Sequence, residues 1–427
     1  MNLTLCLVAI MLIPLASAGL ALIHQGLGRS RSAAHAMIAT LCAMSVAAIV
    51  FVLVGFSFAG FQGGPSHTVT LGSFHFDWLG AASLGATSLR FDNSIDILAA
   101  LTLCFHIFAV GIVAIIPISA GSDRWRLGPI CGATALMAAV SYPLFAHWVW
   151  SGGWLSQLGP MFGIPAFADM GGAGVIHVVG GLMAFSVVWI IGPRRGKYSS
   201  DGMATAIPGH NIVLVVLGCM LALAGWIGLD SAASMLFYGA PPEQVIAIVI
   251  NTMLSASAGG LAVVAVTRVR YRKPDASLSA NGWTAGLVAG SASCGLVSPL
   301  VAILIGLIAG VLVAFMIENL ELRLSFDDPG GAVSVHAGAG AWGLIAFAIF
   351  GPGTAGTMTE NLLAQFVGIA TLAGLILPIL HGGNLLLNRF IRFRVDSDGD
   401  WQGMDIRELG AGAYPEFVIH ADEFVPR

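Results

Sequence analysis

The segment "DMGGAGVIHVVGG" occupies residues 169–181, and a similar segment, "DPGGAVSVHAGAG", occupies residues 328–340. Extended to 169–193 and 328–352, the two align without a gap at an offset of 159 residues, and their identities run from the aspartates to Pro193 and Pro352. In each copy an aspartate, Asp169 or Asp328, precedes a histidine, His177 or His336, by eight residues. Similarity at a fixed offset indicates two copies of one structural unit.

The chain around these segments is a membrane protein by composition. Hydrophobic residues make up 57% of it, charged residues only 9%, and the mean hydropathy is +0.88, which excludes an ordinary soluble domain. We count eleven apolar runs between Leu3 and about Leu387, each near the roughly 20 residues that a helix needs to cross a bilayer. Period-two alternation is weak, so an α-helical bundle is predicted rather than an outer-membrane barrel. The first run lacks an early basic residue, so we expect a retained span and no cleaved signal peptide.

Basic residues predict the topology. Of the 18 Lys and Arg residues, 15 follow odd-numbered spans, whereas Arg90 lies on the other side and Arg407 and Arg427 lie in the tail. The positive-inside rule therefore predicts an outer N-terminus and a cytoplasmic C-terminus. The 15 are Arg29, Arg31, Arg124, Arg126, Arg194, Arg195, Lys197, Arg268, Arg270, Arg272, Lys273, Arg323, Arg389, Arg392 and Arg394.

The two repeats are expected to be inverted across the membrane. The first copy of the segment is span five, which begins outside, and the second is span ten, which begins inside. Five spans per repeat, an odd number, give the inverted arrangement that many transporters use. We therefore expect a transmembrane domain at 1–394, with repeats at about 1–193 and 206–352 and a last span at about 360–388, followed by a cytoplasmic tail at 395–427.

The inversion predicts the depth of the two histidines. Eight helical residues cover about 12 Å, so His177 and His336 approach the middle of a core about 30 Å thick from opposite faces. Polar groups at that depth usually line a pathway. Asp169 and Asp328 are expected to cap helix starts, and Asp169 could also attract cations at the outer mouth. Four other histidines, His24, His35, His106 and His147, are expected to form helix-to-helix hydrogen bonds.

Motifs for other chemistry are lacking. The sequence has no nucleotide-binding loop, zinc motif or nucleophile elbow, and the six cysteines lack metal-ligand spacing. We therefore predict a protein that is not an enzyme, with no cofactor, no metal and no nucleic-acid partner.

Several segments together resemble the ammonium transporter family (Amt/Mep/Rh). They are the two Asp-x7-His segments, "YPLFAHWVWSGG" at 142–153, "AGWIGLDSAAS" at 224–234, "NGWTAGLVAGSASCG" at 281–295 and "GMDIRELGAGAY" at 403–414. The resemblance implies a homotrimer in the lipid bilayer of the cell (inner) membrane, with eleven spans and one pore per subunit. It implies passage of ammonia derived from ammonium, and a PII-type signal protein as a partner of the tail.

Family residues carry over unevenly. Trp150 is similar to the tryptophan of the outer recruitment site, Phe108 to one gate phenylalanine, and His177 and His336 to the twin pore histidines. The departures from the family pattern are Leu229 for the second gate phenylalanine, Asp230 for an asparagine, Ala233 for the recruitment-site serine, and Leu409 and Ala411 for a histidine and a glutamate of bacterial tails.

A pore with an outer aromatic site and paired histidines can be explained physically by the need for selectivity. Ammonium and potassium have similar size and charge, and a bare cation costs several kcal/mol or more in hydrocarbon. Trp150 can hold the cation by its π face, worth about 0.5–2 kcal/mol, and neutral His177 and His336 can orient ammonia and relay the proton. Three alternatives stay open: an Rh-like channel for neutral ammonia or carbon dioxide, an ammonium sensor acting through a partner, and a sodium-coupled symporter. A sodium-coupled symporter would require unwound segments in the middle of two corresponding spans, and the sequence shows no clear pair of such segments.

Overall fold

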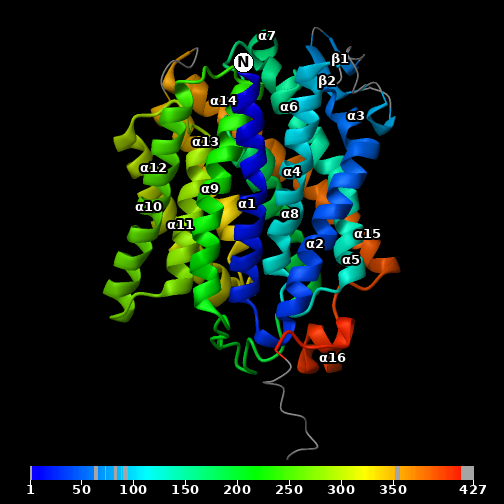
Figure 1. Ribbon diagram of the computed structural model, residues 1–427, viewed down its shortest axis with the longest axis vertical. Coiled ribbons are helices and arrows are strands. Elements are labelled where there is room, and N and C mark those ends of the chain that lie inside the picture. The colour runs from blue at the N-terminus through cyan, green and yellow to red at the C-terminus, as the bar shows by residue number, and fades with distance from the viewer. Residues whose placement is uncertain are drawn as a thin grey trace, which may run out of the picture.

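The computed structural model describes residues 2–61, 66–72, 74–80, 84–87, 89, 95–351 and 356–414. Arg90, Pro352 and residues 415–427 lie outside the described residues. The described chain is a bundle of long helices with a short hairpin at one end and a small helical tail at the other (Figure 1).

Ten helical segments of the described chain are long and apolar enough to cross a membrane. They are Leu3–Leu27 (α1); Ser30–Ala59, with η1 (Ser30–Ser32), α2 (Ala33–Val50), η2 (Phe51–Gly55) and α3 (Phe56–Ala59); Ile97–Ala120 (α4); Leu127–Phe162, with α5 (Leu127–Leu136), η4 (Met137–Ser141), α6 (Tyr142–Trp150), η5 (Trp154–Gln157) and α7 (Leu158–Phe162); Ala173–Ile191, with η6 (Ala173–Val178) and α8 (Val179–Ile191); Ile212–Phe237 (α9); Gln244–Tyr271 (α10); Pro299–Leu324 (α12); Val333–Phe350, with η7 (Val333–Gly338) and α13 (Ala339–Phe350); and Met358–Phe390, with α14 (Met358–Thr371), η8 (Leu372–Ile376) and α15 (Leu377–Phe390).

The expected eighth span coincides with α11 (Ala276–Ser291), which packs against α10 and α12. With 16 residues it is shorter than the other spans. Its last carbonyls are taken up by an extended segment, because Ser291 O and Ala292 O accept hydrogen bonds from Gly171 N and Met170 N at 2.9 and 3.2 Å. The count of eleven spans therefore stays a prediction.

A β-hairpin follows the second span, formed by β1 (Ser66–Leu71) and β2 (Phe74–Gly80), which pair antiparallel. The all-α expectation did not include it. Two side chains of α6 attach it: Trp148 Nε1 donates to Trp78 O at 2.8 Å, and His147 Nε2 lies 3.1 Å from Asp77 Oδ1. His147 thus joins its helix to the hairpin, and its Nδ1 lies 3.1 Å from Ala59 O.

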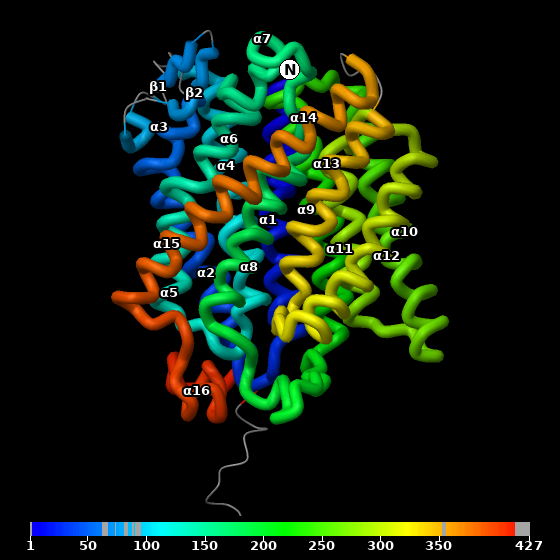
Figure 2. Tube along the Cα trace, turned by 180° about the vertical axis from the view of Figure 1, so that it is seen from behind, coloured from blue at the N-terminus to red at the C-terminus, as the bar shows by residue number. Residues whose placement is uncertain are grey.

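The two ends of the bundle differ. The N-terminus and the hairpin lie at one end, and α16 (Ser397–Gln402) lies at the other (Figures 1 and 2). The segments after spans one, three, five and eleven meet at the end that carries α16, through the ion pairs Arg29–Asp123 and Arg194–Asp123 and the hydrogen bond from Arg31 to Asp400 O at 3.0 Å. Basic residues therefore gather on one side, as the positive-inside argument requires; which side faces the cytoplasm stays a prediction.

The two repeat segments have the same local structure and run in opposite directions. Each begins with a π-helical turn, η6 or η7, preceded by a glycine in the left-handed region, Gly172 at φ 97° and Gly331 at φ 70°. Arg194, just after α8, bonds Asp327, just before η7, so α8 ends where the second segment begins. This antiparallel arrangement agrees with inverted repeats.

Candidate functional site

Two glycines set the distance between the repeat helices. A Cβ added at Gly181 would lie 2.4 Å from Ala337 N, and one added at Gly340 would lie 2.8 Å from Ala173 O. The backbones of the two segments therefore touch, which small residues allow in membrane proteins. The crossing places His177 and His336 side by side, with ring centroids 5.3 Å apart and planes inclined by 29°.

The histidine pair is buried and short of hydrogen-bond partners. Both residues lie in π-helical turns, which are frequent at functional sites, and their exposed fractions are 0% and 2%. The His177 ring lies flat on Trp226 of α9, with centroids 4.8 Å apart. Within the described residues, both ring nitrogens of His177 and Nδ1 of His336 have no hydrogen-bond partner. Since buried polar atoms are nearly always paired, these atoms can serve a small polar guest.

The two repeat aspartates bond the backbone at the starts of the segments that carry the histidines. Asp169 Oδ1 accepts from Gly172 N at 3.1 Å, and Oδ2 accepts from Gly174 N and Val175 N, both at 2.8 Å. Asp328 Oδ2 accepts from Val333 N at 2.7 Å. Both carboxylates therefore take the position of a helix cap. Asp169 is fully buried, and its expected attraction for cations stays a prediction.

Trp150 stands in a cluster of rings near the hairpin end of the bundle. Its Nε1 donates to Asp169 O at 2.9 Å, and its indole stacks on Phe237 at 4.4 Å with planes 8° apart. Phe105 meets it edge-on at 6.0 Å. Phe108, expected as a gate residue, is half-buried and makes no ring contact with Trp150 in the described chain. It lies one turn, about 4.5 Å, further along α4 than Phe105.

The three departures at the expected outer site are buried, with exposed fractions of 0% for Leu229, 1% for Asp230 and 0% for Ala233, whereas Leu409 and Ala411 of the tail are exposed. Asp230 Oδ2 lies 3.5 Å from the Thr252 hydroxyl, and a Cβ added at Gly171 would lie 2.3 Å from Asp230 Oδ1. The carboxylate therefore faces α10 and the extended segment before η6. The sequence singled out Asp230 as a cation ligand or a paired carboxylate, and its Oδ1 has no hydrogen-bond partner among the described residues.

Three aromatic residues and one histidine of this region were not singled out as site residues from the sequence. Trp226, Phe105 and Phe237 are aromatic residues of apolar spans, which usually pack in a core. His106 was expected only as a helix-to-helix bond, and its Nδ1 does lie 2.6 Å from the Tyr142 hydroxyl. What identifies these four residues is that they cluster in space, and a sequence alone does not display such clustering.

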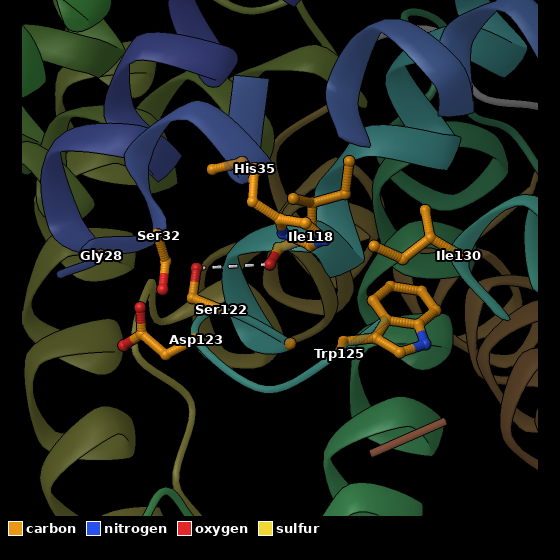
Figure 3. A pocket seen from close by; sticks show the side chains of 10 residues that line it. Gly28, Ser32, His35, Ile118, Ser122, Asp123, Trp125 and Ile130 are labelled. Atoms are coloured by element: carbon orange, nitrogen blue, oxygen red, sulfur yellow. Dashed lines mark hydrogen bonds between the residues drawn. The ribbon is translucent and has the colours of Figure 1, made fainter. Parts of the chain in front are cut away.

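Several cavities lie at the end that carries α16. One, of about 490 Å³, is lined among others by Asn281, Asp328 and Gly331, at the foot of the segment that carries His336. Because of this position it is the candidate opening toward the histidine pair. Another, of about 10 Å³, lies between the start of α2 and the turn after α4, beside Ser32, Ser122 and Asp123 (Figure 3). It holds at most about one water molecule.

Comparison with known proteins agrees with this geometry. The model of the Ammonium Transporter Family matches residues 4–414. Ammonium transporter Amt2 of Archaeoglobus fulgidus is 33% identical over 95% of this chain and 86% of its own length, and the ammonium transporter of Bacillus subtilis is 27% identical over 95% and 96%. Among solved structures, a sensor Amt protein superposes with a TM-score of 0.86 at 27% identity, covering 95% of this chain and 98% of that one. Candida albicans Mep2 superposes with a TM-score of 0.77 at 24% identity, covering 93% and 86%, which concerns the fold alone. The chain described here therefore belongs to the ammonium transporter family.

Proposed function

We propose that this protein carries ammonium nitrogen across the membrane by releasing ammonia from ammonium at the Trp150 cluster and passing it along His177 and His336. The observation that carries the proposal is the buried histidine pair, three of whose four ring nitrogens have no hydrogen-bond partner among the described residues, in a chain of the ammonium transporter family. Leaving such atoms permanently unpaired costs about 1–3 kcal/mol each. A small hydrogen-bonding guest removes that cost.

At the outer cluster the substrate is the cation. The Trp150 face attracts a positive charge by about 0.5–2 kcal/mol, depending on how dry the site is. Stacking with Phe237 and the hydrogen bond to Asp169 O hold the indole in one orientation. Phe108 and Leu229 would form the apolar gate below it, as the family resemblance implies.

Beyond the cluster the substrate is neutral. Apolar surroundings disfavour a charged amine, so ammonium would transfer one proton to an acceptor nitrogen of the neutral histidine pair and continue as ammonia. A neutral imidazole offers one N–H donor and one acceptor nitrogen, which suits ammonia, a molecule with three N–H bonds and one lone pair. His177 and His336 would orient it and relay the proton, while Trp226 covers one face of His177. The inner cavity beside Asp328 would be the exit.

Flux into liposomes tests this function. Purified protein in proteoliposomes should produce ammonium-dependent transport that potassium at equal concentration does not, with carbon dioxide as a third arm. Absence of ammonium-driven flux in oriented, folded protein would refute transport. A response to carbon dioxide alone would instead favour the Rh-like gas channel.

The assembly and its partners are part of the same proposal. We infer a homotrimer in the cell inner membrane, with the basic end and the tail in the cytoplasm. The family resemblance supports the trimer, and the basic residues gathered at one end support the orientation. A PII-type signal protein would dock at the tail. Nucleotide-dependent capture by the full chain, lost on removal of residues 396–427, is the expected result; no capture under any effector condition would count against it.

A sensor is the second candidate, because a sensor Amt protein superposes along nearly its whole length. A sensor would bind ammonium without fast flux and would act through a partner. Tight ammonium binding by calorimetry, together with no flux in the liposome assay, would favour this reading over transport.

A further inference from the structure

His106 of α4 is a buried histidine with one ring nitrogen in use and one free. Its exposed fraction is 0%, and its Nδ1 lies 2.6 Å from the Tyr142 hydroxyl at the start of α6. Its Nε2 has no hydrogen-bond partner among the described residues. Because buried polar atoms are nearly always hydrogen-bonded, an unpaired buried nitrogen is a candidate to bind a ligand.

Aromatic rings surround this histidine on several sides, drawn from the four helical elements η2, α4, α6 and α9 and from Phe61 in the turn after α3. Its ring centroid lies 4.5 Å from that of Phe61, 5.4 Å from Phe51, 5.2 Å from Phe105, 5.5 Å from Phe237, 5.7 Å from Tyr142 and 5.9 Å from Trp150. His106 is therefore part of the same ring cluster as Trp150.

Two other polar groups at this cluster are already engaged. Trp150 Nε1 donates to Asp169 O, and the Tyr238 hydroxyl accepts from Asp169 N at 2.7 Å. Position 233 carries an alanine. Asp230 Oδ1 is unpaired among the described residues, but it lies beside Gly171 in the extended segment before η6 and not among the rings. Of the described rings in contact with Trp150, His106 is thus the one with an unpaired acceptor atom, its Nε2.

We propose that His106 Nε2 accepts a hydrogen bond from ammonium at the Trp150 cluster and supplies the directional contact that a serine hydroxyl at position 233 would give. The inference rests on the proposed function and names a selectivity residue for it. Ammonium has four N–H donors and no lone pair, so π faces balance its charge while an acceptor nitrogen fixes its orientation.

The tautomer of His106 couples this contact to Tyr142. For Nε2 to accept, the ring proton must be on Nδ1, where it donates to the Tyr142 hydroxyl. Potassium carries no N–H donor, so the contact favours ammonium over potassium. Tyr142 is therefore a positioning residue, which acts through the histidine.

The test is ammonium binding and transport by His106→Phe, which keeps an aromatic ring and removes the acceptor. A hydrogen bond to a charged partner is worth about 1.5–3 kcal/mol, so the apparent ammonium affinity should fall about ten-fold or more, with a smaller effect on potassium competition. Tyr142→Phe should lower the affinity less, and His106→Gln, which retains an acceptor, should recover part of it. His67→Phe makes the same exchange at an exposed position of β1 and should change nothing.

Calorimetric titration with ammonium chloride, read beside liposome flux, separates this inference from the proposed function. If His106→Phe leaves the ammonium affinity unchanged while His177→Ala still abolishes flux, the inference is overturned and the proposed transport function is not. His106 would then serve only as a hydrogen bond between α4 and α6. Binding that depends on His106 in a protein without flux would support the inference and refute transport. If His106→Phe does not fold, Tyr142→Phe decides: weaker ammonium binding supports the proposal and unchanged binding overturns it.

Discussion

His177 and His336 meet because each lies eight residues after an aspartate that fixes the start of its segment. We predict that His177→Ala or His336→Ala leaves a folded protein but abolishes selective ammonium-driven flux. Each change deletes both a donor and an acceptor that ammonia needs, and a small cavity is left in place of the ring. Flux in proteoliposomes at matched protein content is the measurement, with His75→Ala on the exposed hairpin as the control. Wild-type flux and selectivity in both variants would exclude the relay role.

The buried positions 230 and 233 give a second prediction at this scale. Ala233→Ser adds a hydroxyl to the proposed outer site and should raise the apparent ammonium affinity, by about ten-fold or more for a charge-assisted hydrogen bond. Asp230→Asn should change the affinity little, because this carboxylate faces Thr252 and Gly171. The KM for ammonium in flux assays measures both. Collapse of uptake in Asp230→Asn, with no effect of Ala233→Ser, would make the aspartate the cation ligand instead.

At the scale of elements, the crossing of the two repeat helices carries the site. A methyl group at Gly181 would lie 2.4 Å from the backbone nitrogen of Ala337, so neither partner can give way as a flexible side chain would. We predict that Gly181→Ala lowers the apparent melting midpoint, since overpacking costs about 1–3 kcal/mol, and that it reduces flux by separating the histidines. Gly382→Ala is the matched control, because a Cβ there has no neighbour within 4 Å. Equal melting and flux in the two variants would refute the tight crossing.

The tail caps two membrane helices. Asp405 Oδ1 accepts from His35 N at 2.7 Å, in the first turn of α2, and Glu408 Oε2 accepts from Leu127 N at 3.0 Å, at the start of α5. Both acceptors belong to η9 (Asp405–Leu409). The tail thus bonds the ends of two spans beside the small cavity of Figure 3, which His35 also lines.

We therefore predict that deleting residues 396–427 alters transport without destroying the pore, and that the double variant Asp405→Ala, Glu408→Ala reproduces the change. Each lost cap costs about 0.5–2 kcal/mol, which loosens the inner ends of α2 and α5. Flux and apparent melting midpoint are the measurements. Asp398→Ala, an exposed carboxylate of the same tail, serves as the control. Unchanged flux in the truncated protein would show that these contacts do not influence the pore.

At the scale of the whole molecule, the sequence predicted the helical class, the membrane setting, the inverted arrangement and the meeting of His177 with His336. Those follow from apolar run length and from a repeat, which are properties of the chain itself. It did not predict that Phe105 and Phe237, and not Phe108, contact Trp150, or that Asp230 faces inward. Such contacts depend on helix rotation and on packing between distant segments, which identical apolar patterns permit in several ways. The hairpin was missed although Phe74, His75, Phe76, Asp77 and Trp78 alternate between apolar and polar residues, because strands of six and seven residues do not stand out among apolar runs of spanning length.

The two repeats are joined at the basic end by a buried ion network. Arg194 donates from Nε and Nη2 to Asp327, both at 2.9 Å, and Nη1 donates to Asp123 at 3.3 Å. Arg124, also buried, donates to Asp327 O at 2.7 Å. The network ties the end of α8 to the start of η7, so it holds one repeat against the other.

Arg194→Ala should be strongly destabilising, because removing one partner of a buried pair leaves an uncompensated charge and costs about 3–5 kcal/mol. Arg270→Ala removes a pair with Glu318 whose side chains are 36% and 26% exposed, and such pairs are worth about 0–1 kcal/mol. The apparent melting midpoint in detergent should therefore fall far more for the first variant. If the melting midpoint falls by a similar amount in both variants, the buried ion network contributes no more to stability than an exposed ion pair does.

The same network predicts how stability depends on pH. Burial alone would raise the pKa of Asp327, but the guanidinium groups of Arg124 and Arg194 outweigh it and hold the pKa below its usual range. A depressed carboxyl pKa gives stabilisation that is present above the unfolded value of about 3.9 and is lost as the pH falls through the folded value. In Arg194→Ala the buried Asp327 carboxylate has fewer positive charges beside it, so its pKa rises. The carboxylate is then protonated at a higher pH, and protonation removes the unfavourable buried charge. The melting deficit of this variant should therefore be smaller at pH of about 4.5 than at about 7.5, whereas a deficit that is constant across this range would place the cost in lost packing and not in the buried charge.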